Sequence, residues 1–61
     1  MIEAVPAALE GERLDRLVAM LGDVSRADAV RLLEAGAVRI DGEVVRAGKQ
    51  RVHEGQVLEL D

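Results

Sequence analysis

The stretch SRADAVRLLEAGAVRIDG, residues 25–42, decides the fold, because it contains one helix with both ends marked and the start of a hairpin. Ser25 is followed three residues later by Asp28, which resembles a capping box, so the Ser hydroxyl is expected to accept from a backbone N–H. Gly36 supplies the left-handed residue that ends many helices. The buried side is expected to comprise Ala29, Val30, Leu32 and Leu33. The pattern predicts a helix over residues 26–35.

The hairpin follows this helix directly. Residues 38–40 read Val-Arg-Ile, in which apolar and polar side chains alternate as they do along a half-buried strand. The dipeptide Asp41-Gly42 tolerates the positive φ angles of a type I′ turn. Residues 43–45 are therefore expected to return antiparallel to residues 38–40.

Upstream of the quoted stretch, residues 12–21 predict another helix, and Gly22 is expected to stop it. Its apolar side chains stand at i, i+3, i+4 and i+7, which places them on one helical face. They are Leu14, Leu17, Val18 and Leu21.

Two further strands complete the predicted sheet. A turn at residues 54–55 precedes an apolar strand over residues 57–60. A short strand is expected over residues 2–5, and Pro6, which cannot donate to a ladder, ends it. The predicted fold class is α+β, with two helices packed on a small, mainly antiparallel sheet.

Length and composition limit both the fold and the function. Sixty-one residues predict a single domain over residues 1–61, and the absence of cysteine excludes disulfides and thiolate zinc sites. The chain has no Phe, Tyr or Trp, so binding modes that stack bases on aromatic rings are not expected. The N-terminal residues resemble neither a signal peptide nor a membrane span. A cytoplasmic protein with no membrane partner is predicted.

The charge of the chain is unevenly distributed. The formal net charge is −4 and the pI is about 4.8, which by themselves disfavour a nucleic-acid partner. Residues 25–53, however, hold six basic side chains against four acidic ones, whereas residues 1–24 and 54–61 each carry a net charge of −3. The middle of the sequence is therefore the only cationic part.

The order and spacing of these motifs resemble a known RNA-binding domain. The matching residues are Arg13-Leu14-Asp15, Ser25-Arg26, Ala29, Leu32-Leu33, Gly36, Val38, Ile40-Asp41-Gly42, Val45 and Val52-x-x-Gly55. Together they are similar to the S-four or alpha-L domain, first described in ribosomal protein four of the small subunit. The resemblance covers residues 12–60 and implies binding to structured RNA, ribosomal RNA above all, with no small-molecule substrate.

The N-terminal phrase VPAALEGERLDRL, residues 5–17, resembles the start of bacterial pseudouridine synthases of the large-subunit ribosomal RNA type. In such enzymes this domain precedes the catalytic one. The resemblance implies that the chain is an accessory, targeting domain whose further partner is a covalently linked catalytic domain.

Eight side chains are candidates for RNA binding. They are Arg13, Ser25, Arg26, Arg31, Arg39, Arg46, Lys49 and Arg51. Arg26 stands in the first turn of its helix, where free backbone N–H groups and the helix dipole already favour a phosphate. Its alternative is an ion pair with Asp23 or Asp28. Arg39 faces outward from its strand, and its alternative is a pair with Glu43 across the hairpin, worth about 0–1 kcal/mol.

If the second helix begins beside the sheet, several of these side chains form one patch. That patch would hold Arg26, Arg39, Arg46, Lys49 and Arg51. Arg31 is ambiguous between solvent and the patch. For Arg13, the family position leaves a functional and a structural role both open, while Arg16 is expected to pair with Glu12 on the helix surface.

No catalytic, metal or cofactor site is predicted. Pseudouridine synthases of the similar class use an aspartate in an Arg-Leu-Asp stretch, but here Leu14 belongs to an apolar helix face and Asp15 is expected in an exposed turn. Sixty-one residues also leave little room for a pocket that encloses a flipped base. His53 has no second ligand at metal spacing and is interpreted as a turn residue.

Two functions follow from this interpretation. The first is a non-catalytic module that binds structured RNA through phosphate and shape contacts. The second is a protein-interaction or structural domain of the same fold with little RNA affinity. Basic side chains that converge on one face favour the first, and basic side chains that each lie beside a carboxylate favour the second.

Overall fold

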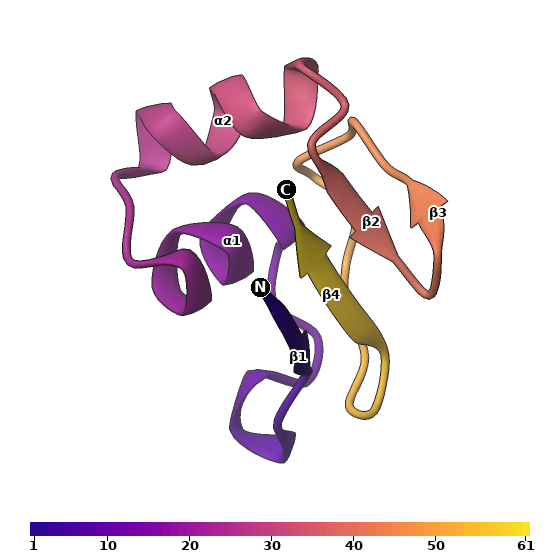
Figure 1. The fold of residues 1–61 in the computed structure, drawn as a ribbon. Coiled ribbons are helices and arrows are strands. Elements are labelled where there is room, and N and C mark those ends of the chain that lie inside the picture. The colour runs from indigo at the N-terminus through magenta and orange to yellow at the C-terminus, as the bar shows by residue number, and fades with distance from the viewer.

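The computed structural model describes residues 1–61 and has the predicted α+β architecture, with both helices on one side of a four-stranded sheet (Figure 1). The elements are β1 (Ile2–Ala4), a short 3-10 turn η1 (Ala7–Leu9), α1 (Leu14–Gly22), α2 (Arg26–Glu34), β2 (Val38–Ile40), β3 (Glu43–Val44) and β4 (Val57–Leu60). Neither helix has the length and apolar character needed to cross a membrane.

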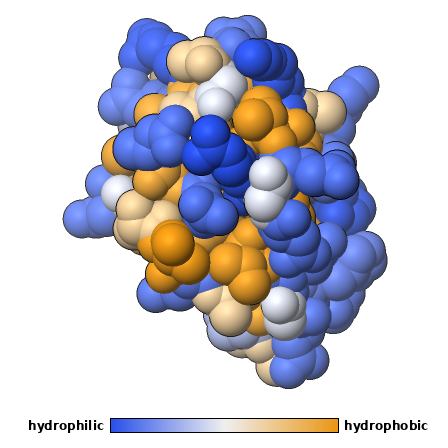
Figure 2. Space-filling model, turned by 45° about the vertical axis from the view of Figure 1, so that its right-hand side comes forward, coloured by the Kyte–Doolittle hydropathy of each residue, from blue (hydrophilic) through white to orange (hydrophobic).

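The sheet is antiparallel throughout and has the strand order β1-β4-β2-β3. Its inner face carries Ile40 and Leu58, which are direct partners across β2 and β4 and are both buried. The same alternation sends the cross-strand row of Ile2, Glu59, Arg39 and Val44 to the outer face. No element covers that face, where apolar side chains lie among charged ones (Figure 2).

The core is aliphatic and is shared by every layer of the fold. Its ten buried side chains are Val5, Leu14, Leu17, Val18, Ala29, Leu33, Val38, Ile40, Val52 and Leu58. Each fully buried Leu or Val stabilises the fold by about 1.5–3 kcal/mol relative to an exposed position. Because α1, α2 and β4 all contribute to this cluster, the helices are held firmly against the inner face of the sheet.

A segment without regular secondary structure, residues 45–52, lies alongside the start of α1. Four backbone hydrogen bonds join the two stretches: Gly11 N to Val52 O (2.8 Å), Val52 N to Glu12 O (2.9 Å), Leu14 N to Gln50 O (2.8 Å) and Asp15 N to Gly48 O (3.1 Å). These bonds fix the long connection between β3 and β4 against the first turn of α1. The sequence patterns did not predict this pairing.

The local signals around α2 and the hairpin are confirmed. The backbone N–H of Asp28 donates to Ser25 Oγ at 3.0 Å, which is the predicted N-cap. Gly36 has φ of +78° at the end of α2. Asp41 and Gly42 both have positive φ, 51° and 84°, as a type I′ turn requires.

The end of α1 differs from the prediction. Gly22 is the last helical residue rather than the residue that stops the helix, and Asp23 takes the left-handed conformation with φ of 54°. A Cβ at Gly22 would lie 3.0 Å from Leu60 Cδ1, so a larger residue there would require the Leu60 side chain to shift. Asp tolerates the left-handed region better than most residues, which lets Asp23 make the turn.

Two side chains lie in environments opposite to those predicted. Val30 is 38% exposed, because Ala29 and Leu33, one helical turn apart, define the buried direction of α2 and Val30 points away from it. Asp15, expected in an exposed turn, is only 4% exposed. Its burial is the origin of the site described below.

The hairpin turn provides a test of the fold. Substitution Gly42→Val forces a β-branched residue to φ of +84°, and we expect it to lower the free energy of unfolding by about 1–2 kcal/mol. No atom lies within 4 Å of a Cβ built at this position, so the effect is one of backbone conformation rather than of steric overlap. Urea unfolding followed by circular dichroism measures it.

Gly42→Asn is the matched control, because Asn visits the left-handed region with less strain. Its midpoint should lie between those of the wild-type protein and Gly42→Val. Equal midpoints for the Val and Asn variants would contradict a type I′ turn.

Candidate functional site

The buried carboxylate of Asp15 connects the starts of the two helices. Arg13 donates two hydrogen bonds to Asp15, from Nε to Oδ1 at 3.2 Å and from Nη2 to Oδ2 at 2.9 Å. The backbone N–H of Arg16 donates to Oδ1 at 2.8 Å. Arg26 Nη2 lies 3.2 Å from the same Oδ1. Asp15 therefore binds guanidinium groups that come from the start of α1 and the start of α2.

The backbone directs each arginine toward this carboxylate. Arg13 is the N-cap of α1, and its extended conformation, with φ of −70° and ψ of 144°, lets its side chain turn toward the first helical turn. Arg26 is the first residue of α2, directly after the capping Ser25. The packing of α2 against α1 then brings the Arg26 guanidinium to Asp15.

The 45–52 segment covers the other side of Asp15. A Cβ at Gly48 would lie 3.0 Å from Asp15 Cβ and 3.1 Å from Oδ2, so a larger residue there would force the Asp15 side chain to shift by a few tenths of an ångström. Arg51 forms an isolated antiparallel bridge with Arg13, which places the two residues directly opposite each other. The Nη1 group of Arg51 donates to the carbonyl oxygen of Gly11 at 3.3 Å.

Two arginines, Arg13 and Arg26, thus contact one acidic side chain. Two further basic residues belong to the covering segment: Lys49, which follows Gly48, and Arg51, which lies opposite Arg13. We call these four residues the basic cluster. Arg13 stands at the N-terminal end of α1 and Arg26 at that of α2, where unpaired backbone N–H groups and the helix dipole add positive potential.

The pKa of Asp15 is lowered by this environment. Burial is the largest single influence and acts to raise the pKa, because it penalises the charged form. The hydrogen bonds from Arg13 and from the N–H of Arg16, together with the charges of Arg13 and Arg26, outweigh burial. Asp15 is therefore a stable anion at neutral pH.

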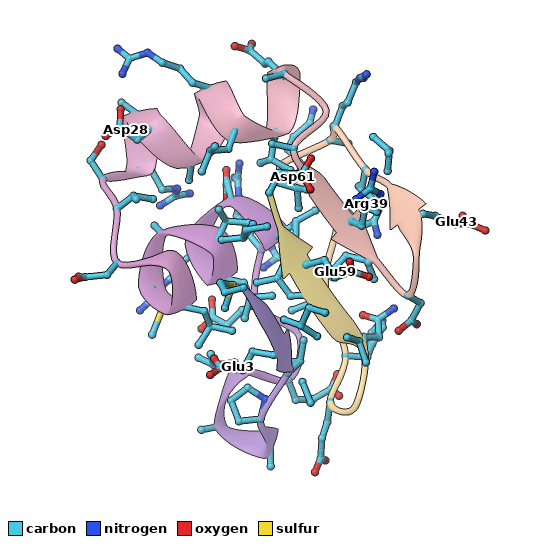
Figure 3. All side chains as sticks on the ribbon, viewed as in Figure 1. Glu3, Asp28, Arg39, Glu43, Glu59 and Asp61 are labelled. Carbon is cyan, nitrogen blue, oxygen red and sulfur yellow. The ribbon has the colours of Figure 1, made fainter.

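The remaining candidate residues lie elsewhere, so the structure does not form the single large patch. Arg39 lies on the outer face of the sheet, 3.3 Å from Asp61 Oδ1 rather than beside Glu43 (Figure 3). Arg46 packs against Gly36, at the opposite end of α2 from Arg26. The length of α2 separates these two positions by about 12 Å.

Three other predicted side chains have local roles. Arg31 pairs with Asp28 at 2.6 Å on the exposed face of α2, and the Ser25 hydroxyl serves as the helix cap. Arg16 pairs with Glu12 at 3.6 Å, as their spacing predicts. These contacts use the side chains in ordinary surface interactions.

A second long-range contact that sequence reasoning missed involves His53. Glu10 Oε2 lies 2.7 Å from His53 Nδ1, and Glu10 Oε1 accepts from the N–H of Glu54 at 2.8 Å. The hydrogen bonds from Glu54 and then from His53 lower the pKa of Glu10. The contact joins η1 to the turn before β4, and no cluster of three metal-ligating side chains occurs in the chain.

Comparison with known proteins gives a consistent result. The family model described as the S4 domain matches residues 12–58. The ribosomal small subunit pseudouridine synthase A of Pseudomonas aeruginosa is 47% identical over 49 residues, which are 80% of this chain and 21% of that protein. An uncharacterized RNA pseudouridine synthase of Chloroflexus aurantiacus is 42% identical over 60 residues, covering 97% of this chain and 19% of the relative.

A solved structure has the same fold. The crystal structure of a pseudouridylate synthase superposes with a TM-score of 0.76 at 27% identity, covering 79% of this chain and 21% of that one. The chain thus spans about a fifth of the length of the proteins that it matches. The relationship to pseudouridine synthases confirms the resemblance in the sequence, although the named Pseudomonas enzyme acts on the small ribosomal subunit.

The buried ion pairs predict how stability depends on pH. The pKa of Asp15 in the folded state lies below its ordinary value of 3.8. Its ionised form therefore contributes fully above about pH 5, and the contribution is lost as the pH falls through the folded-state pKa. We expect the difference in unfolding free energy between the wild-type protein and Asp15→Asn to be constant near neutrality and to shrink below about pH 4.

Urea unfolding of both proteins at a series of pH values measures this difference. All other carboxylates are present in both, so their titration cancels. Stability curves that remain parallel down to the lowest accessible pH would contradict the role assigned to the Asp15 charge.

Proposed function

The chain belongs to the S4 domain family, and on this premise we propose that it is a non-catalytic module that binds structured RNA through phosphate and shape contacts. The observation that carries the proposal is that Arg13 and Arg26, from the starts of α1 and α2, both contact Asp15, with Arg51 directly opposite Arg13. We further propose that the module targets a pseudouridine synthase to its RNA, because two relatives carry that enzyme name, and that the RNA is ribosomal, because the name of one of them says so.

The chemistry of the cluster suits phosphate groups. Guanidinium groups bind phosphate oxygens through paired, charge-assisted hydrogen bonds, and a helix N-terminus supplies further N–H donors. Such contacts position a nucleic acid without reading its sequence. The absence of Phe, Tyr and Trp leaves His53 as the only aromatic ring on which a base could stack, which also favours recognition of a folded RNA by its backbone.

The net charge of −4 is compatible with this function because several of the acidic side chains lie on the sheet rather than at the starts of the helices. The acidic side chains Glu59 and Asp61 lie on the outer face of the sheet, and Glu3 and Glu43 lie on its edge strands (Figure 3). The Debye length at physiological ionic strength is about 8 Å, so charges across the molecule are largely screened from the basic cluster. The cluster therefore acts locally.

The proposed module contributes binding, and the chemistry belongs to a separate catalytic domain. Both carboxylate oxygens of Asp15 already accept hydrogen bonds, from Arg13 and from the N–H of Arg16. This carboxylate is therefore unavailable for chemistry on a base, despite its Arg-Leu-Asp context. A module that makes only a few phosphate contacts binds RNA weakly by itself. When it is tethered to a catalytic domain, the binding of one domain to the RNA raises the effective concentration of the other.

A protein-interaction role is the second candidate, and the uncovered outer face of the sheet favours it. Ile2 is 70% exposed and Val44 is 47% exposed on that face, on either side of Glu59 and Arg39. Arg13, Arg26, Arg31 and Arg39 each lie beside a carboxylate, which is the arrangement that favours this second role. If this chain binds no RNA, the protein-interaction role is the one that we assign to it.

Charge reversal in the cluster tests RNA binding. We expect Arg26→Glu to weaken binding to a fluorescently labelled ribosomal RNA hairpin by about tenfold or more, because it removes a charge-assisted contact and adds repulsion. Arg31→Glu is the matched control, since it makes the same charge change on the same helix outside the cluster. Fluorescence anisotropy gives both dissociation constants.

Salt dependence supplies a second readout in the same assay. The logarithm of affinity should fall linearly with the logarithm of salt concentration, and losing one phosphate contact should reduce the slope by about one unit. Equal losses of RNA affinity in Arg26→Glu and Arg31→Glu would mean that binding depends only on the net charge of the protein. No binding by the wild-type protein, even at low salt, would reject the RNA module.

A further inference from the structure

We propose that Asp15 is a positioning residue for RNA binding, which holds the Arg13 and Arg26 guanidinium groups in the arrangement that receives a phosphate. The inference rests on the proposed RNA-binding function and assigns to this carboxylate a role beyond stability. Its basis is that one buried anion fixes two cations from two different helices.

The ion pairs leave most donors of the two arginines available. A guanidinium group has five N–H donors in a fixed planar fork. Arg13 gives two of them to Asp15, and Arg26 Nη2 forms an ion pair with Asp15 at 3.2 Å. Most N–H donors of both groups are therefore left for phosphate oxygens while both side chains stay beside Asp15. A phosphate can bind without displacing the carboxylate.

The carboxylate itself is firmly placed. It sits in the first turn of α1, accepts from the N–H of Arg16, and is covered by the backbone of Gly48. Arg13 and Arg26, in contrast, have side chains that are 41% and 53% exposed. A long exposed side chain loses conformational freedom when it binds a ligand, and an anchor that restricts it beforehand reduces this loss. Asp15 provides such an anchor for both.

Simple electrostatics predicts the opposite effect for this residue. A negative charge beside a phosphate site repels the ligand, so its removal should strengthen binding. If Asp15 positions the arginines, its removal should weaken binding although the protein becomes less acidic. The sign of the change in affinity therefore distinguishes positioning from simple repulsion.

A second acidic residue on the same molecule gives a matched control. Asp28 lies in the first turn of α2, close in sequence to Arg26, and pairs only with Arg31 on the exposed surface. Asp28→Asn makes the same change in charge and size as Asp15→Asn. Because Asp28 anchors no member of the basic cluster, its loss should follow simple electrostatics.

The experiment compares dissociation constants for the ribosomal RNA hairpin at low and moderate salt. We expect Asp15→Asn to weaken binding about threefold to tenfold, and Asp28→Asn to leave it unchanged or strengthen it. Circular dichroism at the assay temperature establishes that each variant is folded. Affinity of Asp15→Asn equal to or above that of the wild-type protein would overturn the inference.

A double-mutant cycle separates positioning from general loss of stability. If Asp15 acts through Arg26, then Arg26→Ala should weaken RNA binding more in the wild-type protein than in the Asp15→Asn variant. Lys49 has no hydrogen bond or ion pair to Asp15, so the effects of Lys49→Ala and Asp15→Asn should add. Additive effects for both pairs would reject the positioning role.

Gly48→Ala tests the same anchor without any change in charge, and replaces Asp15→Asn if that variant does not fold. Its Cβ would press on the Asp15 side chain at 3.0–3.1 Å. We expect weaker RNA binding with an unaltered net charge. Unchanged affinity in Gly48→Ala would count against the inference, whereas failure of the wild-type protein itself to bind RNA would reject the proposed function and the inference with it.

Discussion

The burial of the Asp15 carboxylate is the constraint on which the arrangement of the surface depends. A buried charge is tolerated only when it is paired and hydrogen-bonded, and here three partners come from two places in the chain: Arg13 and the N–H of Arg16 at the start of α1, and Arg26 at the start of α2. The 45–52 segment must also pass close enough to exclude water, which Gly48 allows. One side chain therefore links the packing of the helices to the position of the cationic residues.

Most of the architecture could be predicted because its signals are local. The cap at Ser25, the left-handed Gly36 and the Asp41-Gly42 turn each depend on residues within four positions of one another, and each is found as predicted. The end of α1 was wrong by one residue, because the tertiary contact of Leu60 with Gly22 is invisible to local spacing. Val30 is a second example, since helical periodicity predicts which side chains share a face but not which of them lies in the middle of the buried face.

The candidate site was less predictable because it is built from contacts between distant segments. Asp15 stands at the margin of the apolar face of α1, next to Leu14 in sequence, and nothing in its local pattern shows that residues 48–52 will cover it. The alternation of β2 correctly sends Arg39 outward, but it does not say that outward is away from α2. The grouping of the arginines follows from the packing of the whole chain and not from their spacing.

Under the proposed function, a small domain without Phe, Tyr or Trp obtains its affinity for RNA mainly from the placement of its charges. The other sources of affinity are small, because stacking has only the His53 ring and a large cationic surface needs more basic residues than a chain of net charge −4 supplies. What remains is to hold a few guanidinium groups so that little freedom is lost when phosphate arrives. In the role that we propose for Asp15, an internal carboxylate does this at the cost of some local repulsion. That role would reconcile the acidic composition with the proposed function, because one of the acids that lowers the net charge would also organise the cations that the function requires.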